Sequence, residues 1–132
     1  MSYKLDGLPG MEEDDIRGLN RIGIVSTGTL LDQCSSVPAR ALVATETGID
    51  ENRLLDWARR VDLARISGVG PNTAERLLSR GIYSVADLRT RSAGELGKLL
   101  SEGPAPLFGD SNILGRVARW IKQSNQLRLV LR

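Results

Sequence analysis

The stretch LARISGVGPNTAERLLSRGI, residues 63–82, decides the fold that this sequence predicts. Gly68 and Gly70 flank one apolar residue, which suits a tight turn because glycine adopts positive φ angles at little cost. Pro71 fits the first position of a helix, where its missing N–H leaves no helical hydrogen bond unmade. Gly81 is placed to end that helix as a left-handed residue. We therefore predict a Gly-x-Gly turn, then a helix that runs from Pro71 to the residue before Gly81.

The residues after the turn continue a helical pattern. Ala74, Leu77 and Leu78 recur at the spacing of one helix face, so that face should be buried. Ser84 is a suitable N-cap for a further helix, and Asp87 stands three residues on, as in a capping box. The segment thus predicts two helices separated by a glycine turn, both facing the same core.

A second copy of this pattern appears when the sequence is shifted by 58 positions. Glycine then falls on glycine, serine on serine and apolar on apolar: Leu5, Leu8, Gly10, Met11, Leu19, Gly23, Ile24, Ser26 and Leu30 align with Leu63, Ile66, Gly68, Val69, Leu77, Gly81, Ile82, Ser84 and Leu88. The first copy is degenerate, because Glu12 stands where the second has Gly70. We expect two pseudo-repeated units in an all-α fold.

The second copy resembles the helix-hairpin-helix superfamily. The superfamily's pattern is an apolar residue, any residue, Gly, an apolar residue, Gly, three residues, Ala and an apolar position. This chain matches it with Ile66, Gly68, Val69, Gly70, Ala74 and Leu77. The wider layout resembles one family, the domain of unknown function numbered 4332. Its members have two such hairpins separated by a helical insert that ends near a tryptophan, as this chain has at Trp57. The resemblance covers about residues 5–100.

The resemblance implies a phosphate-binding role for the second hairpin. In DNA-binding members of the superfamily, backbone N–H groups at the start of the hairpin's second helix hold a phosphate, as the positive end of a helix favours. Such contacts position a protein on nucleic acid without reading its sequence. The implied site comprises Gly68, Val69 and Gly70, with Asn72 and Thr73 as side-chain donors and Arg65, Arg76 and Arg80 as nearby charges.

The chain departs from the DNA-binding pattern at two places. Strong DNA-binding hairpins often carry Lys or Arg directly after the glycines, whereas this chain has Pro71, Asn72 and Thr73. The first hairpin carries the acidic run 12–15, which would repel a phosphate although it suits a helix N-terminus. A glycine turn can also serve packing alone, so a purely structural role for residues 66–70 stays open.

The length and composition agree with a small helical domain. Only 4% of the 132 residues are aromatic, so Leu, Ile, Val and Ala must fill the core. The length allows one compact domain or two small packed halves, and we interpret residues 1–132 as a single domain. Its expected parts are a degenerate first hairpin unit at 5–32, a helical insert at 33–62, a second hairpin unit at 63–91, and C-terminal helices with a tail at 92–132. The tail could be a strand, a continued helix or a partner contact.

Several classes of function lack their usual residues. The chain has no histidine and one cysteine, Cys34, which we expect to be a small buried hydrophobe. We therefore expect no catalytic residues, no metal site and no cofactor. No apolar run reaches the roughly 20 residues that span a bilayer, and the N-terminus does not resemble a signal peptide. No membrane association and a cytoplasmic location are the expectation.

The charge distribution supports two hypotheses about partners. Residues 1–56 hold five Lys/Arg against ten Asp/Glu, while residues 57–132 hold thirteen against six. The leading hypothesis is a non-enzymatic module that binds nucleic acid independently of sequence through the second hairpin and the basic half. The alternative is a protein-interaction or assembly adaptor, in which the oppositely charged halves dock and the apolar tail 127–131 adds a contact. The sequence leaves the oligomeric state open.

Overall fold

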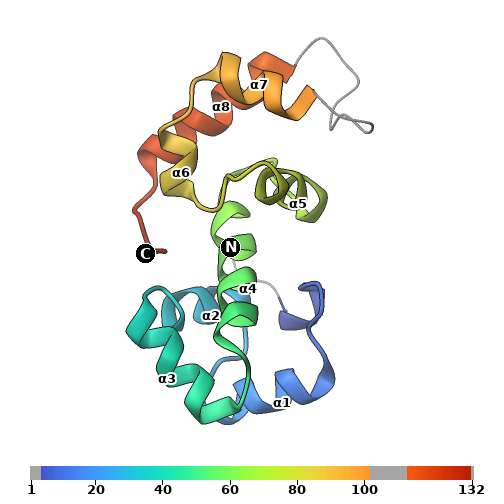
Figure 1. Ribbon diagram of the computed structural model, residues 1–132, viewed down its shortest axis with the longest axis vertical. Coiled ribbons are helices and arrows are strands. Elements are labelled where there is room, and N and C mark those ends of the chain that lie inside the picture. The colour runs from blue at the N-terminus through green and yellow to red at the C-terminus, as the bar shows by residue number, and fades with distance from the viewer. Residues whose placement is uncertain (1–3, 102–112, 132) are drawn as a thin grey trace. The chain divides into compact units, whose positions relative to one another are not determined.

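The computed structural model describes residues 4–101 and 113–131, and in these residues the chain is all-helical, as predicted, with eight α-helices and no strand (Figure 1). A short 3-10 turn, η1, precedes them. The elements are η1 (Leu5–Gly7), α1 (Glu13–Arg21), α2 (Thr27–Gln33), α3 (Val37–Thr47), α4 (Glu51–Leu63), α5 (Pro71–Ser79), α6 (Val85–Arg89), α7 (Ala93–Ser101) and α8 (Ile113–Gln126).

The contacts group the chain into two compact units, each with its own apolar core. Unit 1 is Met1–Asp62 with Val130–Arg132, and unit 2 is Leu63–Leu129. The first unit ends at Asp62, and the interpretation of residues 1–132 as a single domain stays a prediction. Aliphatic side chains and one tryptophan fill each core, which agrees with the low aromatic content.

The two cores draw on every helix of their units. Unit 1 buries Leu5, Leu19, Ile24, Leu30, Leu31, Cys34, Val43, Ile49, Leu54, Trp57, Ala58 and Val61. Unit 2 buries Leu63, Ile66, Val69, Ala74, Leu77, Ile82, Val85, Leu88, Leu96, Leu100, Ile113, Val117 and Trp120. Cys34 is fully buried, and burial raises the pKa of its thiol to about 11, against the opposing charge of Arg40. It is thus a small buried hydrophobe, as predicted.

The local start and stop signals of the second copy act as predicted, except that the Asp87 carboxylate accepts from the Tyr83 N–H at 2.9 Å, one residue before the N–H that a capping box at Ser84 would use. Pro71 is the first residue of α5, and Gly81 follows the helix with a φ of +83°. The Oγ of Ser84 accepts a hydrogen bond from the Asp87 N–H at 3.2 Å and so caps α6. Because these signals depend on neighbouring residues only, the sequence predicts them well.

The backbone hydrogen bonds of the two copies recur at the predicted spacing of 58. Ile24 N–H donates to the Leu19 carbonyl at 2.9 Å, and Ile82 N–H donates to the Leu77 carbonyl at the same distance. Each turn also has a glycine with positive φ: Gly10 and Gly23 in the first copy, Gly68 and Gly81 in the second. The two segments therefore share their local backbone structure as well as their pattern of residue types.

The tail divides its apolar side chains between the two units. Helix α8 ends at Gln126, and the residues after it, up to 131, form neither a helix nor a strand. Leu127 packs against the core of unit 2, while Val130 and Leu131 pack against that of unit 1. Only Leu129 is an exposed apolar side chain of this segment. Most of the apolar surface in the tail is therefore used within the fold.

Candidate functional site

The Gly-x-Gly turn is anchored by two buried side chains and exposes the residues between and after them. Ile66 and Val69 are buried, whereas Ser67, Gly68 and Gly70 are exposed. The Val69 N–H donates to the Ile66 carbonyl at 3.1 Å, so this N–H is already used within the turn. Gly68 has a φ of +93°, a conformation that L-residues with a Cβ rarely adopt.

Helix α5 begins without a side-chain cap. Its N-cap is Gly70, which offers no capping side chain, and its first turn has no acidic residue. The first backbone N–H groups of any helix have no carbonyl partner within it, and here Pro71 contributes none. The N–H groups of Asn72 and Thr73 therefore remain as donors at the helix end. Asn72 is exposed, while the side chain of Thr73 is buried.

The predicted arginines lie at three different positions along this segment. Arg76 lies in the last turn of α5 and Arg80 is its C-cap. At about 1.5 Å per residue, Arg76 is roughly 7 Å along the axis from Pro71. Arg65 lies before the turn and donates to the Arg128 carbonyl. The structure thus brings together Gly68, Gly70, Asn72 and Thr73, while Arg76 lies one helical turn along α5 from Asn72 and Arg80 is the C-cap of the helix.

Helix α8 holds the turn from the other side, in contacts that no local pattern in the sequence predicts. The Ser67 N–H donates to Oε1 of Gln123 at 2.9 Å, and Nε2 of Gln123 donates to the Ser67 carbonyl at 3.4 Å. Nε1 of Trp120 lies 3.3 Å from the position that a Cβ on Gly68 would take. These contacts join residues that are far apart in the chain, so they depend on tertiary packing alone.

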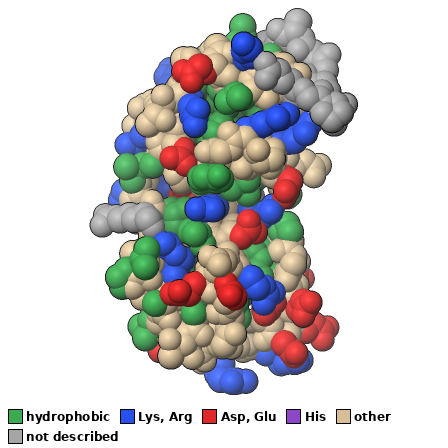
Figure 2. Space-filling model, in the orientation of Figure 1, with side chains coloured by type: hydrophobic (Ala, Val, Ile, Leu, Met, Phe, Trp, Pro, Cys, Tyr) green, Lys and Arg blue, Asp and Glu red, His purple; other side chains and the backbone are tan. Residues whose placement is uncertain are grey.

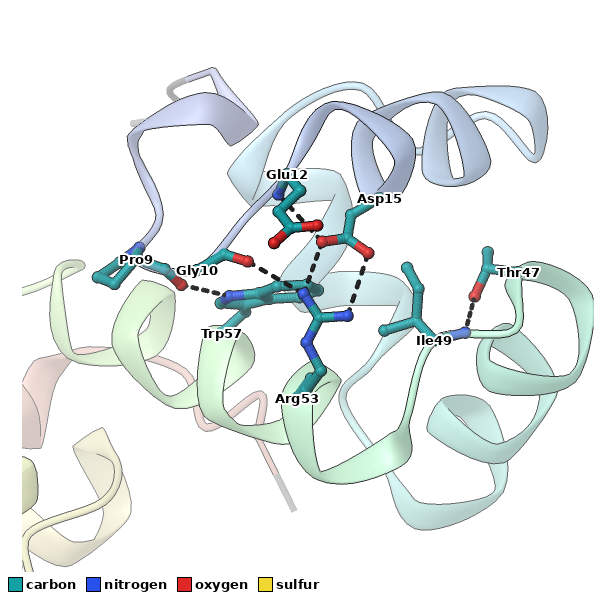
Figure 3. Close-up of polar contacts among 8 residues, drawn as sticks. All are labelled: Pro9, Gly10, Glu12, Asp15, Thr47, Ile49, Arg53 and Trp57. Atoms are coloured by element: carbon teal, nitrogen blue, oxygen red, sulfur yellow. Dashed lines mark hydrogen bonds and ion pairs between the residues drawn. The ribbon is translucent and has the colours of Figure 1, made fainter.

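At the N-terminus of α1, which corresponds to that of α5, an acidic side chain accepts a backbone N–H (Figure 3). Asp15 Oδ2 accepts from the Glu12 N–H at 3.0 Å and from Arg53 Nη2 at 2.6 Å, and Asp15 Oδ1 accepts from Arg53 Nη1 at 3.1 Å. The hydrogen bond from Arg53 lowers the pKa of Asp15, against the desolvation that would raise it. Arg53 also donates to the Gly10 carbonyl at 3.0 Å.

Trp57 braces the first turn next to this ion pair. Its Nε1 donates to the Pro9 carbonyl at 2.8 Å, and the Arg53 guanidinium lies over its ring, 4.8 Å from the centroid (Figure 3). An open depression of about 330 Å³ beside them is lined by Pro9, Gly10, Asn52, Arg53, Asp56 and Trp57. Because Trp57 is buried, its indole serves packing rather than ligand stacking.

The two helix ends differ in electrostatics as well as in capping. Glu12, Glu13 and Asp14 are exposed at the start of α1, and Figure 2 shows acidic side chains gathered over this helix. Counted over the full sequence of each unit, unit 1 holds eight Lys/Arg and eleven Asp/Glu, and unit 2 holds ten and five. The net charges are −3 and +5. The α5 end therefore attracts anions, while the α1 end repels them.

The described part of the chain contains neither a cluster of metal ligands nor a membrane-spanning helix. Within residues 4–101 and 113–131, no three His, Cys, Asp or Glu side chains come together as a group that could hold a metal ion. None of the helices in these ranges combines the length and the apolar character that crossing a membrane requires.

Comparison with known proteins places the chain in a family. The family model described as Domain of unknown function (DUF4332) matches residues 9–127, which is most of the chain. The chain therefore belongs to this family. No curated protein and no solved structure is significantly similar to it.

Proposed function

We propose that this chain is a non-enzymatic module that binds nucleic acid independently of sequence, through the turn 66–70 and the N-terminus of α5. The observation that carries the proposal is the exposed start of α5, which has no side-chain cap and no acidic residue in its first turn. It lies in the unit with a net charge of +5. Such a helix end offers N–H donors and a positive potential to a phosphate.

The proposal includes two helix-hairpin-helix units, at residues 5–32 and 63–91. The recurrence of backbone hydrogen bonds and positive-φ glycines at a spacing of 58 supports this interpretation. The units would differ in use. Asp15 occupies the helix end of the first hairpin with a carboxylate of the chain itself, so we assign phosphate binding to the second hairpin alone.

The experiment is fluorescence anisotropy of labelled double- and single-stranded DNA at low and at physiological salt. The decisive variant is Gly70→Glu, which gives the second hairpin the residue that the first has at position 12. Gly70 has a φ of −91°, and a Cβ added to it would meet no heavy atom within 4 Å, so a side chain fits without strain. The added carboxylate should cap α5 and repel phosphate.

Gly94→Glu is the matched control for charge and residue type. Gly94 lies in the first turn of α7, in the same unit, and also has open space around its Cβ position. We expect salt-sensitive binding by the natural chain and by Gly94→Glu, with at least a tenfold loss in Gly70→Glu. Equal binding by all three would remove the hairpin from the proposal, and no binding at low salt would end it.

A protein-interaction adaptor is the second candidate, and exposed apolar side chains in unit 1 favour it. Val25, Val37 and Leu42 are 63%, 66% and 61% exposed. Light scattering with size-exclusion chromatography tests for self-association, which Leu42→Glu should weaken if these side chains form a contact. A monomer at all concentrations and salt strengths would remove self-assembly from consideration.

A further inference from the structure

Helix α8 is fixed to the turn of the proposed site by specific contacts. Gln123 pairs with both the N–H and the carbonyl of Ser67, and Trp120 lies against Gly68. Trp120 is also part of the core of unit 2. The position of α8 beside the turn is therefore set by packing and by hydrogen bonds together, and the side chains next to Gln123 have a defined place relative to the turn.

Arg119 is a basic side chain on the same side of α8 as Gln123. It precedes Gln123 by four residues, and residues four apart are neighbours on one side of an α-helix. Arg119 is exposed, so its guanidinium is accessible from solvent. Arg116, a further turn away on the same side, is half-buried.

The charge of α8 is of one sign. From Ile113 to Gln126 the helix carries Arg116, Arg119 and Lys122 and no acidic residue. Its buried side chains, Ile113, Val117, Trp120 and Ser124, form the opposite stripe. A helix with an apolar inner face, and with basic residues as its only charged side chains, suits a polyanion.

We propose that α8 forms the second half of the nucleic-acid-binding surface, with Arg119 contacting the phosphate backbone beside the phosphate held at α5. This inference rests on the proposed function. The N-terminus of α5 supplies protein backbone N–H groups for one phosphate. Arg119 supplies a positive charge and several N–H donors for a neighbouring phosphate of the nucleic acid. Its charge would add to that of Arg76, which lies one helical turn from Asn72 on α5.

The test compares the salt dependence of duplex binding in Arg119→Gln and in Arg21→Gln. Arg21 is an exposed arginine in the last turn of α1, in unit 1, so both variants lose the same charge. One lost phosphate contact should make the slope of log K against log salt shallower by about 1. We expect this change in Arg119→Gln, with about two- to fivefold weaker binding, and a natural slope in Arg21→Gln.

The Gln123→Leu variant separates the effect of the position of α8 from the effect of the charge of Arg119. It removes both hydrogen bonds to Ser67 but no charge, so we expect weaker binding with an unchanged slope. Thermal melting of each variant is the control for correct folding. If Gly70→Glu loses binding while Arg119→Gln keeps the natural affinity and slope, the role of α8 is refuted and the hairpin proposal stands. If the natural chain binds no DNA, both proposals fall together.

Discussion

Arg53 and Asp15 form a two-point ion pair across 38 residues of sequence, with Nη2–Oδ2 at 2.6 Å and Nη1–Oδ1 at 3.1 Å. The pair joins the start of α1 to α4, two elements that have no local reason to meet. The Asp15 carboxylate also accepts the Glu12 N–H at the start of α1, so the protein itself supplies an acceptor at this helix end. The same feature therefore connects two elements of unit 1 and places a carboxylate at the N-terminus of α1.

Breaking this pair should destabilise unit 1. For Arg53→Gln we expect a loss of about 1–2 kcal/mol in the free energy of unfolding, between the values for exposed and for buried pairs, because Asp15 is largely buried and Arg53 is partly exposed. Urea unfolding measures the loss. Arg17→Gln, which removes the largely exposed pair with Asp14, should change the free energy of unfolding by less than about 0.5 kcal/mol. Equal effects of the two variants would contradict the prediction.

The same carboxylate makes stability depend on pH. The pKa of Asp15 is lowered in the folded chain, chiefly by the hydrogen bond from Arg53. A lowered folded pKa means that the stabilisation is complete above the unfolded value of about 4 and is lost as the pH falls through the folded value. Between about pH 5 and pH 2 we expect the natural chain to lose more stability than Asp15→Asn. Parallel pH profiles from chemical unfolding would argue against this role.

Three glycines should respond differently to alanine. Gly81→Ala should cost about 1–2 kcal/mol, because its φ of +83° is unfavourable for a residue with a Cβ. Gly68→Ala should cost more, since the new Cβ would also lie 3.3 Å from Trp120 Nε1. Gly94→Ala should stabilise by about 0.5–1 kcal/mol, because it is helical with open space around it. Thermal unfolding ranks the three, and any other order would contradict the geometry.

The tail should matter to unit 1 through two side chains. Val130 and Leu131 pack against its core, whereas Leu129 is exposed. We expect the Leu131→Ser change to lower the free energy of unfolding by about 1 kcal/mol, as for a partly buried apolar side chain. Leu129→Ser should leave it nearly unchanged. Hydrogen exchange of α1–α4 amides locates the effect, and faster exchange confined to α5–α8 would show that the packing is assigned to the wrong unit.

The sequence predicts most of what depends on neighbouring residues. The start of α5 at Pro71, its end before Gly81 and the cap at Ser84 follow from local backbone chemistry, and all three are present. The class of fold follows from composition and helical periodicity in the same way. These features need no knowledge of distant parts of the chain.

The contacts that shape the candidate site join residues that are far apart in the chain, so the sequence does not predict them. Gln123 meets Ser67 across 56 residues, and neither residue carries a pattern that would reveal the pair. Arg76 and Arg80 follow the glycines closely in the sequence, which suggests them as site residues. On the helix, Arg80 is the C-cap, whereas Arg76 lies one turn from Asn72. Arg119 is indicated only by the packing of α8.

The return of Val130 and Leu131 to unit 1 has a consequence for how the protein is made. Unit 2 is one continuous segment, so it can close its core as soon as residues 63–129 have left the ribosome. Unit 1 is synthesised first, and every buried side chain of its core lies within residues 1–62, so this core can form before unit 2 is complete. Domains generally fold in the order of their synthesis. Here unit 1 would fold first in the same way, and Val130 and Leu131 would add their packing to its core only once residues 130–131 have been made.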